Sequence, residues 1–199
     1  TTTVSVSATD VAGNEGTGSG TVVVDATAPD APAVALTTDS GTAADLITND
    51  GALTVTPNEA TSTIEYSTDG GTTWSTTAPT ATEGANTVSV REVDTAGNAS
   101  AATDITFTLD TTAPVVAVND ITLTNDTTPE LTGTVDDANA TVVVTIGGVD
   151  YPAVNNGDGT WTLADNAVAA LADGTTTVSV SATDVAGNEG TGSGTVVVD

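Results

Sequence analysis

The stretch TTTVSVSATDVAGNEGTGSGTVVVD occupies residues 1–25 and recurs without a change at residues 175–199. Identical 25-residue segments displaced by 174 positions indicate that the chain is built from tandem repeats. Each copy alternates Val with Thr or Ser, reaches the turn Asp-Val-Ala-Gly-Asn, and ends in a second run rich in Thr and Val. Alternation with period two on both sides of a Gly-Asn turn predicts a β-hairpin.

A weaker copy lies between the two identical segments, where residues 87–90 (TVSV) lead to residues 94–98 (DTAGN). Residues 25–29 (DATAP) and 110–114 (DTTAP) each follow a strand-like run, and each proline restricts the chain to an extended crossing. We therefore expect residues 1–25 to be the last two strands of a preceding module. Complete immunoglobulin-like modules are expected at 26–110 and 111–199, a size suited to a seven-stranded sandwich.

Short runs of Val, Thr and Ile broken by Gly, Asn and Asp predict an all-β chain. The expected architecture is a series of tandem immunoglobulin-like Greek-key β-sandwiches in an extended array. In the last module the expected strands cover residues 115–123, 130–135, 141–146, 150–154, 160–163, 175–183 and 194–198.

Several local features refine this expectation. Val178, Val180 and Ala182 share one face of their strand and should point to the core, whereas Glu92 replaces that alanine in the middle module. Trp161 and Trp74 follow the turn signals at 155–159 and 69–71, which predicts that both are core aromatic residues. Residues 165–174 (DNAVAALADG) combine an Asp cap, an Ala-rich interior and a final Gly, which predicts a turn or two of helix.

Composition excludes several classes of chemistry. The chain has 27 Asp or Glu residues against a single cation, Arg91, and no His, Cys or Met, for a formal charge of −26. Nucleic acid and anionic membrane surfaces are therefore poor partners, because both bind through Lys and Arg. An enzyme would have to rely on paired carboxylates alone, and we do not expect one. No apolar run approaches the roughly 20 residues of a membrane-spanning helix, so any export signals should lie elsewhere.

The motif T-V-S-V-x-x-x-D-x-A-G-N, followed by a strand and D-x-T-A-P, resembles the bacterial immunoglobulin-like repeats of large RTX-type adhesins exported by type I secretion. The resemblance implies an extracellular, outer-membrane-tethered protein of the cell surface. In it, these modules would be calcium-dependent extender repeats that project a distal binding domain for adhesion or biofilm formation. A module that binds glycan, ice or a receptor is the alternative, as is a subunit of an extracellular filament.

Any bound metal should be a hard, oxygen-liganded cation, and Ca²⁺ is the natural candidate because no soft ligand is present. In an immunoglobulin-like topology the linker, the loop after the second strand and the loop before the last strand meet at one pole of the module. The candidate ligands are Asp25, Asn58, Glu59 and Asp94 at the first junction. At the second junction they are Asp110, Asp136, Asp137, Asn139 and Asp184, with Asp39, Asp45 and Asp50 from the opposite pole of the middle module.

Each candidate has a simpler alternative. Asp10, Asp94 and Asp184 open a Gly-Asn turn and would serve equally well as turn caps. Asp39, Asp45 and Asp50 could instead belong to a solvated acidic loop. Gly97 and Asn98 are most simply a tight turn, and Asp69 and Asp158 are interpreted as turn residues.

The expected partners are the neighbouring modules of the same chain. Residues 1–25 raise a separate question, because a hairpin without its other strands exposes half a core and two unpaired edges. We expect another chain to complete it, or the hairpin to be disordered.

Overall fold

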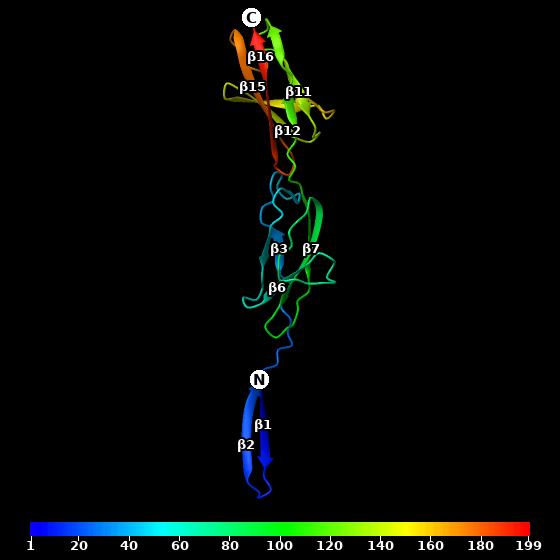
Figure 1. Ribbon diagram of the computed structural model, residues 1–199, viewed down its shortest axis with the longest axis vertical. Coiled ribbons are helices and arrows are strands. Elements are labelled where there is room, and N and C mark those ends of the chain that lie inside the picture. The colour runs from blue at the N-terminus through cyan, green and yellow to red at the C-terminus, as the bar shows by residue number, and fades with distance from the viewer. The chain divides into compact units, whose positions relative to one another are not determined.

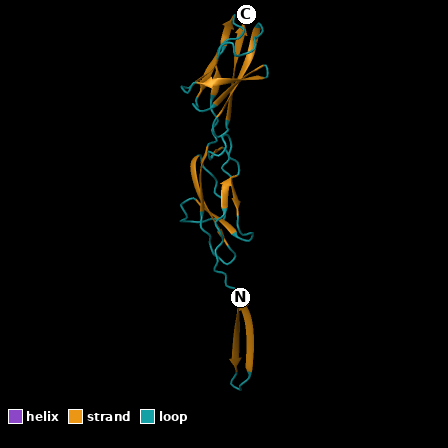
Figure 2. Ribbon diagram, turned by 180° about the vertical axis from the view of Figure 1, so that it is seen from behind, coloured by secondary structure: helices purple, strands orange, loops and turns teal.

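The computed structural model describes all 199 residues, and they form sixteen β-strands and no helix (Figures 1 and 2). The all-β class predicted from the sequence is confirmed. The structure contains no helix long and apolar enough to cross a membrane. The chain divides into two compact units: one comprises Thr1–Ala35, Thr54–Pro79 and Thr87–Ile105, and the other Leu36–Leu53, Thr80–Asn86 and Thr106–Asp199.

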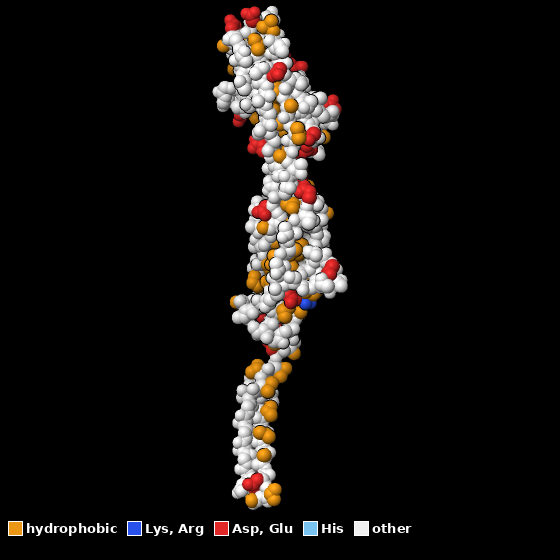
Figure 3. Space-filling model, viewed as in Figure 1, with side chains coloured by type: hydrophobic (Ala, Val, Ile, Leu, Met, Phe, Trp, Pro, Cys, Tyr) orange, Lys and Arg blue, Asp and Glu red, His pale blue; other side chains and the backbone are white.

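The N-terminal hairpin consists of β1 (Thr2–Thr9) and β2 (Glu15–Val22), paired antiparallel from Thr2↔Val22 to Thr9↔Glu15. Its apolar side chains are exposed, and Val4 and Val6 keep 55% and 65% of their surface accessible. Figure 3 shows hydrophobic side chains running along this hairpin. The predicted hairpin is confirmed.

The segment from residue 26 to residue 110 carries six strands. β3 (Ala33–Leu36) pairs with β5 (Leu53–Thr56), and a four-stranded sheet has the order β4-β8-β7-β6. The strands of this sheet are β4 (Ile47–Thr48), β6 (Thr63–Ser67), β7 (Gly84–Val93) and β8 (Thr103–Leu109). Val90 and Phe107 are buried, and Glu92 on β7 is buried as completely as Val90.

The C-terminal sandwich contains β9 to β16, hydrogen-bonded in the order β10-β16-β15-β12-β13-β14-β11-β9. β13 pairs with both β12 and β14 and so joins the two faces. The strands are β9 (Val116–Val118), β10 (Ile121–Thr124), β11 (Leu131–Val135), β12 (Thr141–Ile146), β13 (Val149–Asn155), β14 (Thr160–Leu163), β15 (Gly174–Thr183) and β16 (Glu189–Val198).

The core of the sandwich lies between these faces and is almost entirely aliphatic. Val178, Val180 and Ala182 are all buried, as the alternation predicted. Trp161 is fully buried beside Leu131, and its indole N–H donates to the Ala117 carbonyl at 2.9 Å. The N–H therefore keeps a partner when the ring leaves water, which a buried indole requires.

The glycine alternation of β16 lets β9 approach closely. A Cβ at Gly190 would lie 1.7 Å from the Pro114 carbonyl oxygen, and one at Gly192 would lie 2.4 Å from the Val116 carbonyl oxygen. In the N-terminal hairpin, a Cβ added at the matching glycines Gly16 and Gly18 would meet no atom closer than 3.5 Å. The same sequence therefore carries a packing surface that is used in one copy and open in the other.

Two predicted strands of the last module differ in the structure. The expected strand 115–123 divides into β9 and β10, which join opposite edges: β9 pairs with β11, and β10 pairs parallel with β16. The Asp120 carboxylate between them accepts the Thr195 N–H at 2.6 Å and so helps hold the crossing. The last strand begins at Glu189 rather than at 194, because its pairing with β15 extends back to the turn.

The expected helix at 165–174 does not form. Asn166 has φ +63°, and the N–H groups of Asn166 and Leu171 donate to the carbonyls of Thr128 and Thr127 instead of to a helical ladder. Val168 is buried among the core residues. Tertiary pairing outweighs helical propensity here, because so short a helix has a costly nucleus.

Trp74 was predicted to be a core residue, and that prediction is wrong. Its side chain is only partly buried and stacks with Arg91, whose guanidinium carbon lies 4.1 Å from the ring centroid. The indole N–H donates to the Gly71 carbonyl at 3.0 Å, within its own loop. Only Trp161 fills a core, because its strand β14 pairs along β11 and directs the ring inward.

Candidate functional site

The Asp-x-Ala-Gly-Asn turns all fold in one way. Asp94 Oδ1 accepts the N–H groups of Ala96 at 2.9 Å and Asn98 at 2.8 Å, and Oδ2 accepts the Asn98 side-chain amide at 2.7 Å. Asp184 likewise accepts the Asn188 N–H at 2.8 Å through Oδ1 and the Asn188 side-chain amide at 2.9 Å through Oδ2. The hydrogen bond from the Asn98 side chain holds the pKa of Asp94 below its usual value, and that from Asn14 does the same for Asp10.

These carboxylates therefore act as turn caps, the simpler of the two roles considered for them. The role leaves some acceptor capacity unused, since two carboxylate oxygens offer about four lone-pair sites. Asp94 and Asp184 are also largely buried, at 9% and 8% exposure.

The turn asparagines connect the turns to the linkers. The Asn188 amide donates both to its own Asp184 and to the Asp110 carbonyl, the latter at 2.8 Å. The Asn98 amide bonds the Asp25 carbonyl in the same way at 3.2 Å. From the sequence, Asn98 was assigned only a local turn role. The recurrence of Asn in every copy of the motif was a signal that this side chain also contacts the linker.

The side chains of the two linker aspartates turn back on their own segments. Asp25 Oδ1 accepts the Thr27 N–H and Asp110 Oδ1 accepts the Thr112 N–H, both at 3.0 Å. Each linker is thus an Asx turn whose carbonyl is held by the asparagine of the next turn. Sequence reasoning placed these aspartates beside the turns correctly but did not foresee that the backbone carbonyl makes the contact.

A further carboxylate that sequence reasoning missed joins the second linker. Glu83 accepts the Thr111 hydroxyl at 2.9 Å and its N–H at 3.3 Å. No motif marks Glu83, because the contact depends on the fold bringing residues 80–86 to the linker.

Asp136 and Asp137 occupy the loop between β11 and β12. Asp136 Oδ1 accepts the Val115 N–H at 2.7 Å, and the Asp136 N–H returns a bond to the Val115 carbonyl at 3.2 Å. Asp137 Oδ1 caps the turn at the Asn139 N–H, at 2.8 Å. Both acids thereby hold the pole of the sandwich at which its first strand begins.

The corresponding loop of the middle segment is organised by Glu92. Its carboxylate is fully buried and accepts the N–H groups of Asn58 and Glu59 and the Ser62 hydroxyl. The sequence marked Glu92 only as a break in an apolar stripe. In the structure, hydrogen bonds to both carboxylate oxygens of Glu92 offset the cost of burying this acid in an apolar stripe.

The acidic loop 39–50 contacts the turn at Asp184, as its assignment to the second junction predicted. The Ser40 hydroxyl donates to the Ala186 carbonyl at 2.6 Å, and the Thr42 N–H donates to the Val185 carbonyl at 3.0 Å. A Cβ at Gly41 would lie 2.1 Å from the Val185 oxygen, so only glycine permits this approach. All these residues belong to one compact unit.

Within that loop each acid caps a local turn. Asp45 Oδ1 accepts the Ile47 N–H at 2.9 Å, and Asp50 Oδ1 accepts the Ala52 N–H at 3.1 Å. Asp39 Oδ2 accepts the Ala44 N–H at 2.7 Å, but Asp39 Oδ1 is buried and has no hydrogen-bond partner. A buried, unpaired carboxylate oxygen is costly, and a cation is one of the few groups that would satisfy it.

The donor chemistry of these junctions suits calcium, but the arrangement does not gather a complete ligand set. No three acidic side chains converge closely enough to hold a metal ion. The junctions instead supply separate carboxylates, backbone carbonyls and the unpaired Asp39 oxygen, whereas Ca²⁺ takes six to eight oxygens. The predicted ligands therefore remain a prediction.

Residues 117–199 match the family model of the bacterial Ig-like domain. This match lies within the C-terminal sandwich and covers less than half of the chain. Residues 1–25 repeat the sequence of residues 175–199, the end of the matched region. No curated protein is similar enough to the chain to be matched.

Several solved structures are similar to the chain. A tetra-tandem repeat in the extending region of a large adhesion protein is 27% identical, with a TM-score of 0.40, over 99% of this chain and 56% of that one. A Ca²⁺-stabilized adhesin with which an Antarctic bacterium binds ice is 26% identical, with a TM-score of 0.40 and the same coverage. Fibronectin(III)-like modules of Clostridium thermocellum CbhA are 17% identical, with a TM-score of 0.45, over 84% of this chain and 94% of that one. The chain thus spans little more than half the length of the two adhesin structures.

Proposed function

We propose that the chain is an extender segment of a bacterial cell-surface adhesin, in which tandem Ig-like modules project a distal binding domain away from the cell. The observation that carries the proposal is the recurrence of one linker arrangement. At residues 25–29 and again at 110–114, a turn asparagine binds the carbonyl of the linker aspartate. Repetition of a junction, rather than of an exposed binding face, is what a spacer requires.

In this proposal the modules lie outside the cell, in a protein tethered to the outer membrane and exported by type I secretion, and serve adhesion or biofilm formation. The chain's acidic composition suits that setting. A net charge of −26 keeps concentrated stalks soluble and separate. Module boundaries at residues 25/26 and 110/111 belong to the same proposal.

Two kinds of interaction stiffen the junctions in this proposal. Direct hydrogen bonds from Ser40 and Thr42 to the 184–188 turn need no metal. Calcium adds to them by neutralising the carboxylates around Asp110 and Asp184 and by satisfying the unpaired Asp39 oxygen. A site with a Kd of about 0.1 mM would stabilise the bound form by roughly 2.7 kcal/mol at about 10 mM Ca²⁺.

The test combines calcium stoichiometry with small-angle scattering. We expect the chain to bind Ca²⁺ with millimolar or tighter affinity and its scattering to show a stiffer particle in Ca²⁺ than in EGTA. Replacing Asp110 and Asp184 together by Ala should remove at least one bound ion and the Ca²⁺-dependent stiffening. Asp158→Ala is the matched control, because Asp158 caps a hairpin turn through Thr160. Unchanged stoichiometry in the double variant would reject these ligands, and scattering that ignores Ca²⁺ would reject calcium stiffening.

The proposal also includes a partner for the N-terminal hairpin. β1 and β2 pair in the register that β15 and β16 adopt, since Thr2↔Val22 corresponds to Thr176↔Val196. Val180 is 2% exposed under the other strands of the sandwich, whereas its counterpart Val6 is 65% exposed. The partner we propose is a set of strands of the β9–β14 type, from a neighbouring module or another chain.

A shortened chain tests this partner. A chain that ends at Asp173 keeps the N-terminal hairpin but lacks β15 and β16, so its open sandwich should accept the hairpin of another molecule. We expect head-to-tail oligomers by ultracentrifugation, and we expect Val4→Thr combined with Val6→Thr to prevent them. A shortened chain that stays monomeric at about 0.1 mM would count against a hairpin of useful affinity.

A further inference from the structure

A surface groove on the middle segment combines aromatic and hydroxyl groups. It encloses about 320 Å³, within the range of small-molecule sites. Its floor and walls include Tyr66 on β6 and Trp74 and Pro79 from the loop that follows. The remaining lining is rich in hydroxyl groups, from Ser67, Thr68, Thr73, Ser75 and Thr77, together with Ala78.

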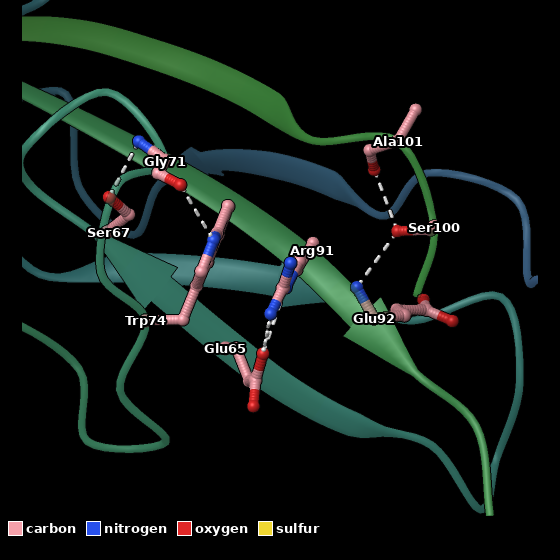
Figure 4. A network of polar contacts seen from close by, with 8 residues as sticks. All are labelled: Glu65, Ser67, Gly71, Trp74, Arg91, Glu92, Ser100 and Ala101. Carbon is pink, nitrogen blue, oxygen red and sulfur yellow. Dashed lines mark hydrogen bonds and ion pairs between the residues drawn. The ribbon is translucent and has the colours of Figure 1, made fainter. Parts of the chain in front are cut away.

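The indole at the edge of the groove is held in place on two sides. Its N–H donates to the Gly71 carbonyl at 3.0 Å, and the Arg91 guanidinium lies over its ring at 4.1 Å. Glu65 in turn holds Arg91 through Nε and Nη2, at 2.9 and 2.7 Å (Figure 4). A side chain already held in one position loses little entropy when a ligand packs on it.

The loop that carries Trp74 is also ordered before any ligand arrives. The Asp69 carboxylate accepts the N–H and hydroxyl of Thr73 at 2.9 and 2.7 Å, and the Ser67 hydroxyl at 2.7 Å. The backbone hydrogen bond from Thr73 is the largest of the contacts that lower the pKa of Asp69 to about 2. The groove is therefore preformed.

This indole is less buried than the corresponding residue of the C-terminal sandwich. Trp161 follows the corresponding turn of the C-terminal sandwich and is fully buried, where it contributes to the core. Trp74 keeps part of its apolar ring accessible to water although Arg91 lies over it, and covering that part would be favourable.

The charges around the groove select the class of ligand. An anion would meet the field of a chain with net charge −26, and the only cation, Arg91, is already neutralised by Glu65. A cation stacked on Trp74 would oppose the positive Arg91 already over the ring. A purely apolar ligand would take polar groups of the lining, such as the Thr68 and Thr77 hydroxyls, away from water.

We propose that the groove of Tyr66, Trp74 and Pro79 binds one unit of a neutral carbohydrate. The apolar C–H face of the sugar ring stacks against the aromatic groups, and its hydroxyl groups bond with the Ser and Thr side chains. This site is separate from the junctions, so the extender proposal and this one stand or fail independently.

The test titrates the full chain with neutral hexasaccharides of glucose, mannose and xylose and follows the heat of binding by calorimetry, a signal that does not depend on Trp74. We expect saturable binding of at least one sugar below about 10 mM, and we expect Trp74→Ala to weaken it at least about tenfold. Trp74→Phe should retain part of the affinity because it keeps an aromatic face. Leu123→Ala is the control, since Leu123 is a large exposed side chain outside the groove.

Other outcomes would overturn the proposal. One is the absence of saturable binding by every neutral sugar up to about 10 mM. Another is equal affinity in Trp74→Ala, which would place the binding elsewhere. A third is equal or tighter binding of oligogalacturonate or of a chitosan hexamer, which would reject a neutral ligand in favour of an anionic or a cationic one.

Discussion

Replacing Gly41 by Ala should detach the acidic loop 39–50 from the turn at residues 184–188. The new Cβ would lie 2.1 Å from the Val185 carbonyl oxygen, a distance at which either the loop or the turn must move. Movement breaks the Thr42 N–H bond to Val185, 3.0 Å long, and the Ser40 hydroxyl bond to Ala186, 2.6 Å long. Two such bonds contribute about 1–3 kcal/mol net, so the docked state should become about 5- to 150-fold less populated.

Amide hydrogen exchange of Thr42 reports this docking directly, because the Thr42 N–H is one of the two bonds in question. Gly41 also has φ +68°, so any Ala there carries backbone strain unrelated to docking. Gly70→Ala is the matched control, since Gly70 has φ +69° and open space around its missing Cβ. We expect Thr42 to lose protection in Gly41→Ala and to keep it in Gly70→Ala. Equal protection in the two variants would refute the argument that this contact holds the loop.

Glu92→Ala should destabilise the chain by about 2–5 kcal/mol, measured by urea unfolding, because it empties a fully buried position and removes the acceptor of the Asn58 and Glu59 N–H groups. Exposed Glu130→Ala should cost under about 0.5 kcal/mol, and similar costs for both would contradict the burial argument. Asp69 has its pKa lowered from 3.8 to about 2, chiefly by the Thr73 N–H, so its stabilisation should be complete above pH 3.8 and lost as the pH falls towards 2. Urea titrations of wild type and Asp69→Asn should therefore converge across that window, and a difference that persists at pH 2 would reject the assignment. Trp161→Ala should cost about 3–5 kcal/mol by the same measurement, far more than Trp74→Ala, and equal losses would contradict the different burial of the two rings.

The candidate junctions were found from the sequence only in part. The Asp-x-Ala-Gly-Asn motif located the turns, and the D-x-T-A-P segments located the linkers, because both are local patterns that recur. The contribution of Glu83 could not be anticipated, since it meets Thr111 only through folding. The bond from Asn188 to the Asp110 carbonyl was equally hidden, because a sequence pattern does not reveal which backbone oxygen faces a side chain.

The sequence by itself determined the repeat, the strand character of most segments, and the inward face of Val178, Val180 and Ala182. These follow from composition and from period-two alternation, which are properties of neighbouring residues. Only the tertiary structure decided that β9 and β10 join opposite edges, that residues 165–174 form no helix, and that Trp74 is only partly buried while Trp161 is fully buried. Those outcomes depend on which distant backbone groups and side chains meet, and local preferences of a few tenths of a kcal/mol per residue yield to such contacts.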